Sequence, residues 1–360
     1  MLCCISPPSK PFPCLCCVLQ GGVFEADETC GVPFSPGFVV FLFISTAAAA
    51  WVFHDYGSRT EGSRWERLAW LLGTLLALPI FLPIYLIAAR PPGRLARCPS
   101  CGRPTVTHRA ACRHCGNAIA FEPPPRIWGL GEVVGIALVF MITLPVVAAA
   151  LGIQSTPSLV ELSGLALAQN LMFIGLTLYV VRMRYQLPLA DLGVRVERWP
   201  AWAAAGLLIG ALSIPVSTQV EELSIALISL FIGRGSAEQM AEQEHLSDVL
   251  TGILQDPISM PEFAWILFLV CVLVPIGEEI FFRGFIYGTL RRWGLATAVV
   301  LSALFFSAVH QQIVHFLPIF VLGVVLAVVY ERTRSLLPSM VIHAVNNVVA
   351  ILSVFYGWNI

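Results

Sequence analysis

The sequence predicts an all-α fold, a polytopic bundle of transmembrane helices that carries one small cytoplasmic domain. Of the 360 residues, 57% are hydrophobic and only 12% are charged, whereas a soluble domain carries about a quarter charged residues. The mean hydropathy is +0.81. The apolar residues also gather in long stretches, so most of the chain must be dissolved in lipid.

A helix needs roughly 20 apolar residues to cross the hydrocarbon core of a membrane. About nine stretches come close to this length, and they are residues 36–53, 67–89, 131–152, 158–181, 201–219, 263–290, 294–310, 313–330 and 336–356. Residues 219–233 either extend the fifth span or form an interfacial helix. We therefore expect a bundle of about nine spans.

These stretches divide the sequence into four parts. Residues 1–35 are rich in cysteine and proline, lack the features of a signal peptide, and receive no assignment. Residues 36–90 form two N-terminal transmembrane helices, residues 91–126 a polar loop, and residues 127–360 the main helical domain. No long basic run occurs, so nucleic acid is not expected as a partner.

Arginine in the connecting loops predicts the orientation of the spans. The loops that follow spans two, four, six and eight are rich in arginine, and such loops stay on the cytoplasmic side. Their arginines are Arg90, Arg94, Arg97, Arg103, Arg109, Arg113 and Arg126, then Arg182, Arg184, Arg195 and Arg198, then Arg291 and Arg292, then Arg332 and Arg334. We expect a cytoplasmic N-terminus and a multi-pass protein of a bacterial inner (cell) membrane.

The loop between spans two and three contains two C-x-x-C pairs, Cys98 with Cys101 and Cys112 with Cys115, and each pair is followed by glycine. This spacing predicts a zinc ribbon in which four thiolates hold one structural zinc ion. Two disulfides are the alternative, which a cytoplasmic location disfavours. Four protein ligands leave no open position for chemistry, so we expect a folding or docking module that binds a cytoplasmic protein.

The last four spans contain ionisable residues, which are costly in a membrane and mark functional sites. In span six, Glu279 and Arg283 have the i, i+4 spacing of a helical ion pair. Glu278 points about 100° away around the helix and is free to act as a base in a cavity. Pro275 and Gly277, just upstream, can loosen the helix and admit water.

Two further pairs with the i, i+4 spacing follow in spans seven and nine. Phe306 can pack beside the imidazole of His310, and His343 shares one face with Asn347. His343 and Asn347 can donate hydrogen bonds to an oxygen that becomes negative when a carbonyl is attacked. Glu278 with His310 can take a proton from water and return it to the leaving amine. The residues therefore predict a hydrolytic site.

The motifs E-E-x-x-x-R, F-x-x-x-H and H-x-x-x-N on successive late spans resemble those of the CPBP family. This family unites type II CAAX prenyl endopeptidases with bacterial abortive-infection and bacteriocin-immunity proteins. The resemblance covers roughly residues 130–360 and identifies residues 127–360 as a CPBP-type intramembrane protease domain. The residues that it implicates are the catalytic Glu278, His310, His343 and Asn347 and the supporting Glu279, Arg283 and Phe306.

The resemblance implies an intramembrane endopeptidase that cleaves membrane-associated or C-terminal-tail substrates with water activated by glutamate and histidine. Zinc would suit the same ligands, but Arg283 occupies one carboxylate and no H-E-x-x-H helix is present, so we favour a metal-free attack. The main alternative is a non-catalytic membrane regulator, or an immunity-type binding protein, on the same fold. A transporter that uses the glutamates as a proton relay is a second alternative.

Overall fold

In the computed structural model the described residues are 36–91, 93, 95–107, 110–119, 128–150, 152–153, 158–195, 197–244, 253–254 and 258–357. The cysteine-rich segment 1–35 lies outside them. The chain divides into two units, residues 1–44 and 45–360. In the first unit the described residues form the N-terminal part of one helix, and every other described element belongs to the second unit.

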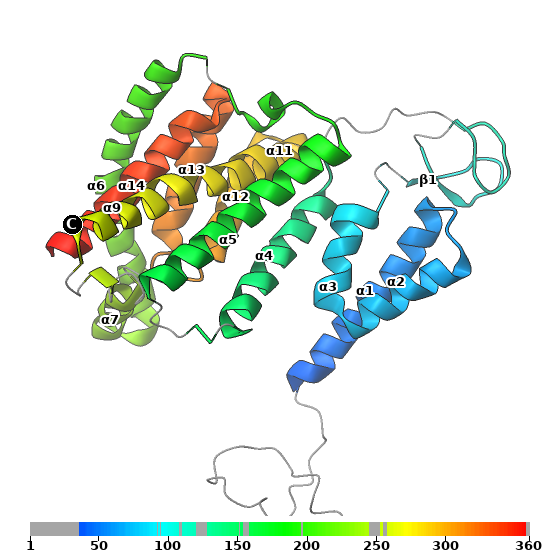
Figure 1. Cartoon of the computed structure of the whole chain (residues 1–360), viewed down its shortest axis with the longest axis horizontal. Coiled ribbons are helices and arrows are strands. Elements are labelled where there is room, and N and C mark those ends of the chain that lie inside the picture. The colour runs from blue at the N-terminus through cyan, green and yellow to red at the C-terminus, as the bar shows by residue number, and fades with distance from the viewer. Residues whose placement is uncertain are drawn as a thin grey trace, which may run out of the picture. The chain divides into compact units, whose positions relative to one another are not determined.

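Nearly all of the described elements are helices (Figure 1). In the N-terminal part they are α1 (Pro36–Arg59), α2 (Arg64–Leu76), α3 (Leu78–Ile84), η2 (Tyr85–Ala89), β1 (Leu95–Arg97) and β2 (Pro104–Val106). They continue with α4 (Leu130–Ala150), α5 (Leu159–Leu178), η3 (Tyr179–Arg184), η4 (Leu189–Leu192), α6 (Trp199–Ile232) and α7 (Arg234–Glu244). The C-terminal elements are α9 (Met260–Phe268), η5 (Leu269–Leu273), α10 (Val274–Glu279), η6 (Ile280–Tyr287), α11 (Gly288–Leu290), η7 (Arg291–Trp293), α12 (Leu295–Val309), α13 (Phe316–Thr333) and α14 (Leu336–Tyr356).

The all-α transmembrane fold predicted from the sequence is confirmed. Among the described residues, six helices are long and apolar enough to cross a membrane, and they are Leu130–Ala150, Leu159–Arg184, Trp199–Ile232, Met260–Trp293, Phe316–Thr333 and Leu336–Tyr356. Two other apolar helices, Leu78–Ala89 and Leu295–Val309, are shorter. The chain is therefore a multi-pass membrane protein, while the expected count of about nine spans is not confirmed and stays a prediction.

Two details of the predicted spans are decided by the structure. The second predicted span, 67–89, is divided at Ala77 between α2 and α3. Pro79, in the first turn of α3, has no backbone N–H to donate to the preceding turn, which explains the break. Residues 219–233 are an extension of the fifth span, because α6 continues as one helix to Ile232.

The helix that starts at Met260 and runs to Trp293 lies at the centre of the bundle. In its most apolar stretch of 18 residues, 50% of the residues are buried, whereas the share is 17–33% in the other long apolar helices. Figure 1 shows α5 and α14 beside it, and both contact it. Phe173 of α5 stacks on Phe281 (ring centroids 4.6 Å apart), and Trp128 stacks on Phe285 (4.9 Å). These aromatic contacts fix the segment that carries the two adjacent glutamates.

Arginines that follow the fourth and sixth predicted spans contact the end of the second span and the start of the third. Arg184 of η3 forms an ion pair with Glu132 of α4 (3.3 Å) and donates to the carbonyl oxygens of Ile87 and Ala88 in η2. Arg292, after span six, donates to the carbonyl oxygen of Trp128 (3.3 Å). The predicted grouping of these loops at one end of the bundle agrees with these contacts.

The loop after the eighth predicted span joins the same group through Glu331. This carboxylate pairs with Arg291 (3.0 Å) and with Arg334 (2.9 Å), which come from the loops after spans six and eight. That the arginine-rich end of the bundle is cytoplasmic stays a prediction.

The cysteine-containing loop folds around a short hairpin. Strands β1 and β2 pair antiparallel, with Leu95 opposite Val106. The guanidinium of Arg113, within the second cysteine pair, donates to the carbonyl oxygens of Gly57 and Thr60 at the end of α1. The hairpin domain is therefore attached to the end of the first helix by hydrogen bonds from the Arg113 side chain to backbone carbonyl oxygens.

Candidate functional site

Glu279 and Arg283 form the ion pair that their spacing predicts. Oε1 of Glu279 lies 2.7 Å from Nη1 of Arg283, and the two side chains are 0% and 1% exposed. The guanidinium also lies over the ring of Phe306, 4.2 Å from its centroid. Because a buried charge is stable only with a partner, the pair holds the charges in place within the helix.

Glu278 points away from this pair, as the sequence predicts. Its Oε1 atom accepts a hydrogen bond from Nε2 of Gln169 on α5 (3.1 Å). Its Oε2 atom is buried and has no hydrogen-bond partner among the described residues. The residue is 8% exposed. A carboxylate that is held by one oxygen and lacks a hydrogen bond at the other is suited to bind water or a substrate group.

The helix is irregular on both sides of these glutamates. Both residues lie in the short α10, between the π-helical turns η5 and η6. Such turns release backbone carbonyls from the helical pattern and are frequent at functional sites. The loosening that we predicted from Pro275 and Gly277 is therefore present, in the form of π-helical turns.

Two amides of α5, Gln169 and Asn170, were missed by the sequence reasoning. Asn170 faces Gly277 so closely that a Cβ atom at this glycine would lie 2.2 Å from the Asn170 Oδ1 atom. That oxygen is also buried without a hydrogen-bond partner among the described residues. The signal was a pair of amides within an otherwise apolar span, since polar side chains there bond between helices.

His343 of α14 joins the two glutamates. Its Nδ1 atom lies 3.1 Å from Oε1 of Glu279, and its Nε2 atom lies 3.8 Å from Oε2 of Glu278. The carboxylate of Glu279 accepts a hydrogen bond, so Nδ1 carries a proton and Nε2 is directed at Glu278. We call Glu278, Glu279, Arg283 and His343 the glutamate–histidine cluster.

His310 is not brought into contact with Glu278. It follows α12 and is exposed, and among the described residues it forms no ion pair with that carboxylate. Its Nδ1 atom donates to the carbonyl oxygen of Phe306 (2.7 Å), so Nε2 is the nitrogen that can exchange protons. The predicted packing with Phe306 is confirmed, because the two ring centroids are 4.9 Å apart and the rings meet edge to face.

Phe306 lies between the two histidines of the predicted site. Its ring meets that of His343 edge to face as well, with the centroids 5.6 Å apart. The ring is 1% exposed. His310 therefore adjoins the glutamate–histidine cluster through Phe306 and not by a direct polar contact.

Asn347 lies one turn after His343 and lines a cavity. Its Nδ2 atom donates to the carbonyl oxygen of Val270, a residue of the π-helical turn η5 (2.8 Å). The cavity has a volume of about 210 Å³ and is lined by Ile214, Ser217, Thr218, Glu221, His315, Pro318, Asn346, Asn347, Val349, Ala350 and Ser353. One amide proton of Asn347 is used to orient the side chain, and the second remains for a group in the cavity.

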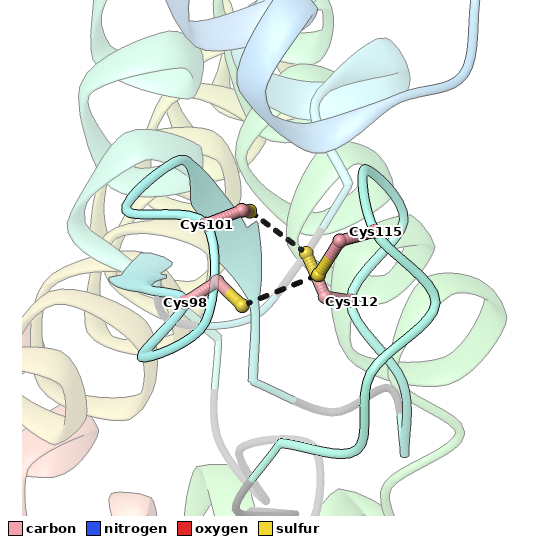
Figure 2. A group of neighbouring side chains, drawn as sticks. All are labelled: Cys98, Cys101, Cys112 and Cys115. Carbon is pink, nitrogen blue, oxygen red and sulfur yellow. Dashed lines mark hydrogen bonds between the residues drawn. The ribbon is translucent and has the colours of Figure 1, made fainter.

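The four cysteines of the hairpin domain converge (Figure 2). The Sγ atoms of Cys98 and Cys115 are 3.7 Å apart, as are those of Cys101 and Cys112. All four sulfurs lie within 4.8 Å of one another. A tetrahedron with zinc–sulfur bonds of about 2.3 Å has edges of about 3.8 Å, so the site fits zinc.

The two cysteine pairs have the same backbone geometry. Gly102 and Gly116 adopt positive φ angles of 69° and 72°, and their N–H groups donate to the carbonyl oxygens of Cys98 and Cys112 (both 2.8 Å). The turn directs backbone N–H groups at the sulfurs. The N–H of His114 donates to Sγ of Cys112 (3.4 Å), and this hydrogen bond lowers the pKa of that thiol to about 6. A thiolate is the form that binds zinc.

Comparison with known protein families gave a match for the membrane segment and a match for the cysteine-containing loop. Residues 260–349 match the model of the type II CAAX prenyl endopeptidase, Rce1-like family. Residues 94–122 match the model of the ChsH2 rubredoxin-like zinc ribbon domain. The chain therefore contains a zinc ribbon with a structural zinc site, and a membrane segment similar to a protease family. Curated proteins and solved structures gave no match.

Proposed function

We propose that the chain is an intramembrane endopeptidase that hydrolyses peptide bonds of membrane-associated or C-terminal-tail substrates. The observation that carries the proposal is the position of Glu278. Its carboxylate is buried in the membrane segment that is similar to the protease family, is oriented by Gln169, and has an oxygen 3.8 Å from His343 that lacks a hydrogen bond among the described residues. A water molecule bound to this oxygen would lie where Glu278 can take its proton.

In the proposed reaction, Glu278 removes a proton from water and the water oxygen attacks the carbonyl carbon of the substrate. The carbonyl oxygen becomes negative and is stabilised by hydrogen bonds from the second amide proton of Asn347 and from Nε2 of His343, which must carry a proton for this because Nδ1 donates to Glu279. The C–N bond then breaks, and the leaving amine receives the proton that water lost. A substrate group or a water molecule bridges His310 to Glu278, and His310 then exchanges this proton at Nε2. The exposed position of His310 favours such a bridge.

We favour attack by water that is not bound to a metal. Oε1 of Glu279 already receives both Arg283 and Nδ1 of His343, so among the described contacts only Oε2 of this carboxylate is left for another ligand. Among the described residues, the group whose ligand atoms converge for a metal is the four cysteines. The proposed location is the inner membrane of a bacterium, with the N-terminus and zinc ribbon cytoplasmic.

The test compares peptide termini in membranes from cells that contain wild-type protein, Glu278→Gln or Glu242→Gln at matched abundance. Glu242 is an exposed acid on α7 and controls for loss of one negative charge. New termini that occur with wild type and Glu242→Gln but not with Glu278→Gln would support the proposal and identify the substrates. No difference among three folded proteins would instead favour the non-catalytic regulator.

A further inference from the structure

The segment between α12 and α13 directly follows His310. Three consecutive backbone N–H groups of this segment, those of Ile313, Val314 and His315, are directed at one carboxylate, that of Glu244 at the end of α7. Their nitrogens lie 2.8, 2.8 and 3.2 Å from its oxygens. A negative group is also favoured at this place because α13 begins at the next residue.

Other contacts hold the same segment. Nε2 of Gln312 donates to the carbonyl oxygen of Glu244 (2.6 Å), and Nδ1 of His315 lies 3.3 Å from its carboxylate. The hydroxyl of Ser224 on α6 donates to the carbonyl oxygen of Val314 (2.6 Å). Glu244 therefore bonds to four consecutive residues, 312–315, through its side chain and its backbone.

Helix α7 is placed for this contact by a reversal of the chain. Gly233, with a φ angle of 83°, separates α6 from α7. Ala237 and Ala241 of α7 have i, i+4 spacing and are buried in a cluster with Ile225 and Val314. The small side chains allow α7 to pack closely, and Glu244 follows one turn later beside the segment.

The segment is short and strained, so its position affects His310. Gln311 has a φ angle of 57°, a left-handed conformation that a non-glycine residue keeps only when its surroundings hold it. Two residues separate His310 from Ile313, the first residue bound by the Glu244 carboxylate. On its own helix, the exposed His310 side chain is held by Phe306 alone, through its Nδ1 hydrogen bond and the ring contact, so the path of the following segment also sets its position.

We propose that Glu244 is a positioning residue for His310. Helix α7 acts as a strap: its terminal carboxylate fixes residues 312–315, and these fix the direction of the His310 side chain. The role of His310 in turnover rests on the proposed protease function, whereas the strap itself does not.

The experiment compares full-length wild type, Glu244→Gln, Glu244→Asp and Glu242→Gln in the same detergent. Glu242 lies on the same helix, is exposed, and gives the same change of charge. Amide hydrogen exchange of residues 311–316 reports the strap directly. The ¹³C signal of the His310 ring, assigned among the seven histidines by a His310→Asn variant, reports the position of the side chain.

We expect exchange in this segment to be roughly tenfold faster in Glu244→Gln, because hydrogen bonds to a charged group are lost. The His310 signal should shift or broaden in the same variant, Glu244→Asp should restore part of both effects, and Glu242→Gln should resemble wild type. Unchanged exchange would show that Glu244 does not hold the segment. Faster exchange with an unchanged His310 signal would overturn the positioning role.

Turnover separates this inference from the proposed function. If wild type cleaves membrane proteins, Glu244→Gln should lower the yield of new termini, and Glu242→Gln should not. If wild type cleaves nothing but both structural signals change, the protease proposal fails and the strap remains. A Glu244→Gln protein with changed structural signals and full turnover would contradict a contribution of the strap to catalysis.

Discussion

Nδ1 of His343 lies 3.1 Å from Oε1 of Glu279, the same oxygen that binds the guanidinium of Arg283 at 2.7 Å. Glu279 therefore links an ion pair within one helix to a histidine on another helix. A carboxylate on Nδ1 fixes the tautomer and the direction of the imidazole. In this arrangement Glu279 supports His343, while Glu278 faces the other ring nitrogen.

The buried pair of Glu279 and Arg283 predicts a large loss of stability when one member is replaced. Arg283→Met leaves a buried carboxylate without its cation, which costs about 3–5 kcal/mol. The double variant Glu279→Gln, Arg283→Met removes both charges, so its thermal midpoint in detergent should be higher than that of Arg283→Met alone.

Arg234 and Glu238 on α7 provide the matched comparison. They have the same i, i+4 spacing and a 2.7 Å contact, but their side chains are 73% and 52% exposed. Arg234→Met should leave the thermal midpoint almost unchanged, because an exposed ion pair contributes little to stability. A double variant of the buried pair that unfolds as early as Arg283→Met would show that lost charge pairing is not the cause.

Replacing Gln169 should lower the turnover of substrate with little loss of stability. Gln169→Met keeps the length of the side chain but removes the donor to Glu278 Oε1. Loss of a hydrogen bond to a charged group costs about 1.5–3 kcal/mol, so the yield of new termini should fall roughly ten- to a hundredfold. Gln243→Met on the exposed face of α7 is the control. Equal yields from both variants would mean that Gln169 does not orient the base.

The sequence was sufficient for the contacts within single helices. The ion pair of Glu279 with Arg283 and the packing of Phe306 with His310 follow from i, i+4 spacing, which sets distances along a helix whatever surrounds it. The zinc site was also predictable, because each cysteine pair is local and its glycine sets the turn.

Contacts between different helices were harder to predict from the sequence. The contact of His343 with Glu279 joins residues 64 positions apart, and no periodicity encodes how α14 rotates against α10. The same limit explains why Gln169 was not predicted, since it meets Glu278 across two helices and 109 positions of the sequence. The expected approach of His310 to Glu278 also depended on helix packing, and in the structure the Phe306 ring lies between His310 and His343 instead.

The donor geometry predicts one zinc ion per chain, bound by the four cysteines. Purified wild-type protein should contain about one equivalent by elemental analysis, and Cys112→Ser should contain far less, because a structural site needs all four ligands. Cys271→Ser replaces a buried cysteine of η5 and should keep the metal. A second equivalent that Glu278→Gln removes would contradict the metal-free proposal.

His315 predicts a dependence of stability on pH. Burial alone lowers its pKa, but hydrogen bonds and charges from Glu221 on α6 and Glu244 on α7 outweigh burial, so the pKa is raised above 6.5. Its ring nitrogens lie 3.6 Å from Glu221 and 3.3 Å from Glu244. A raised pKa in the folded state means that the protonated ring stabilises the fold.

The stabilisation from protonated His315 is complete below pH 6.5, the ordinary pKa of histidine in the unfolded chain. It is lost as the pH rises through the higher pKa of His315 in the folded state. The thermal midpoint of wild type should therefore fall over this window, and His315→Asn should flatten the fall. His54→Asn, at an exposed histidine of α1, should keep the wild-type profile. A His315→Asn profile parallel to that of wild type would show that another group produces the pH dependence.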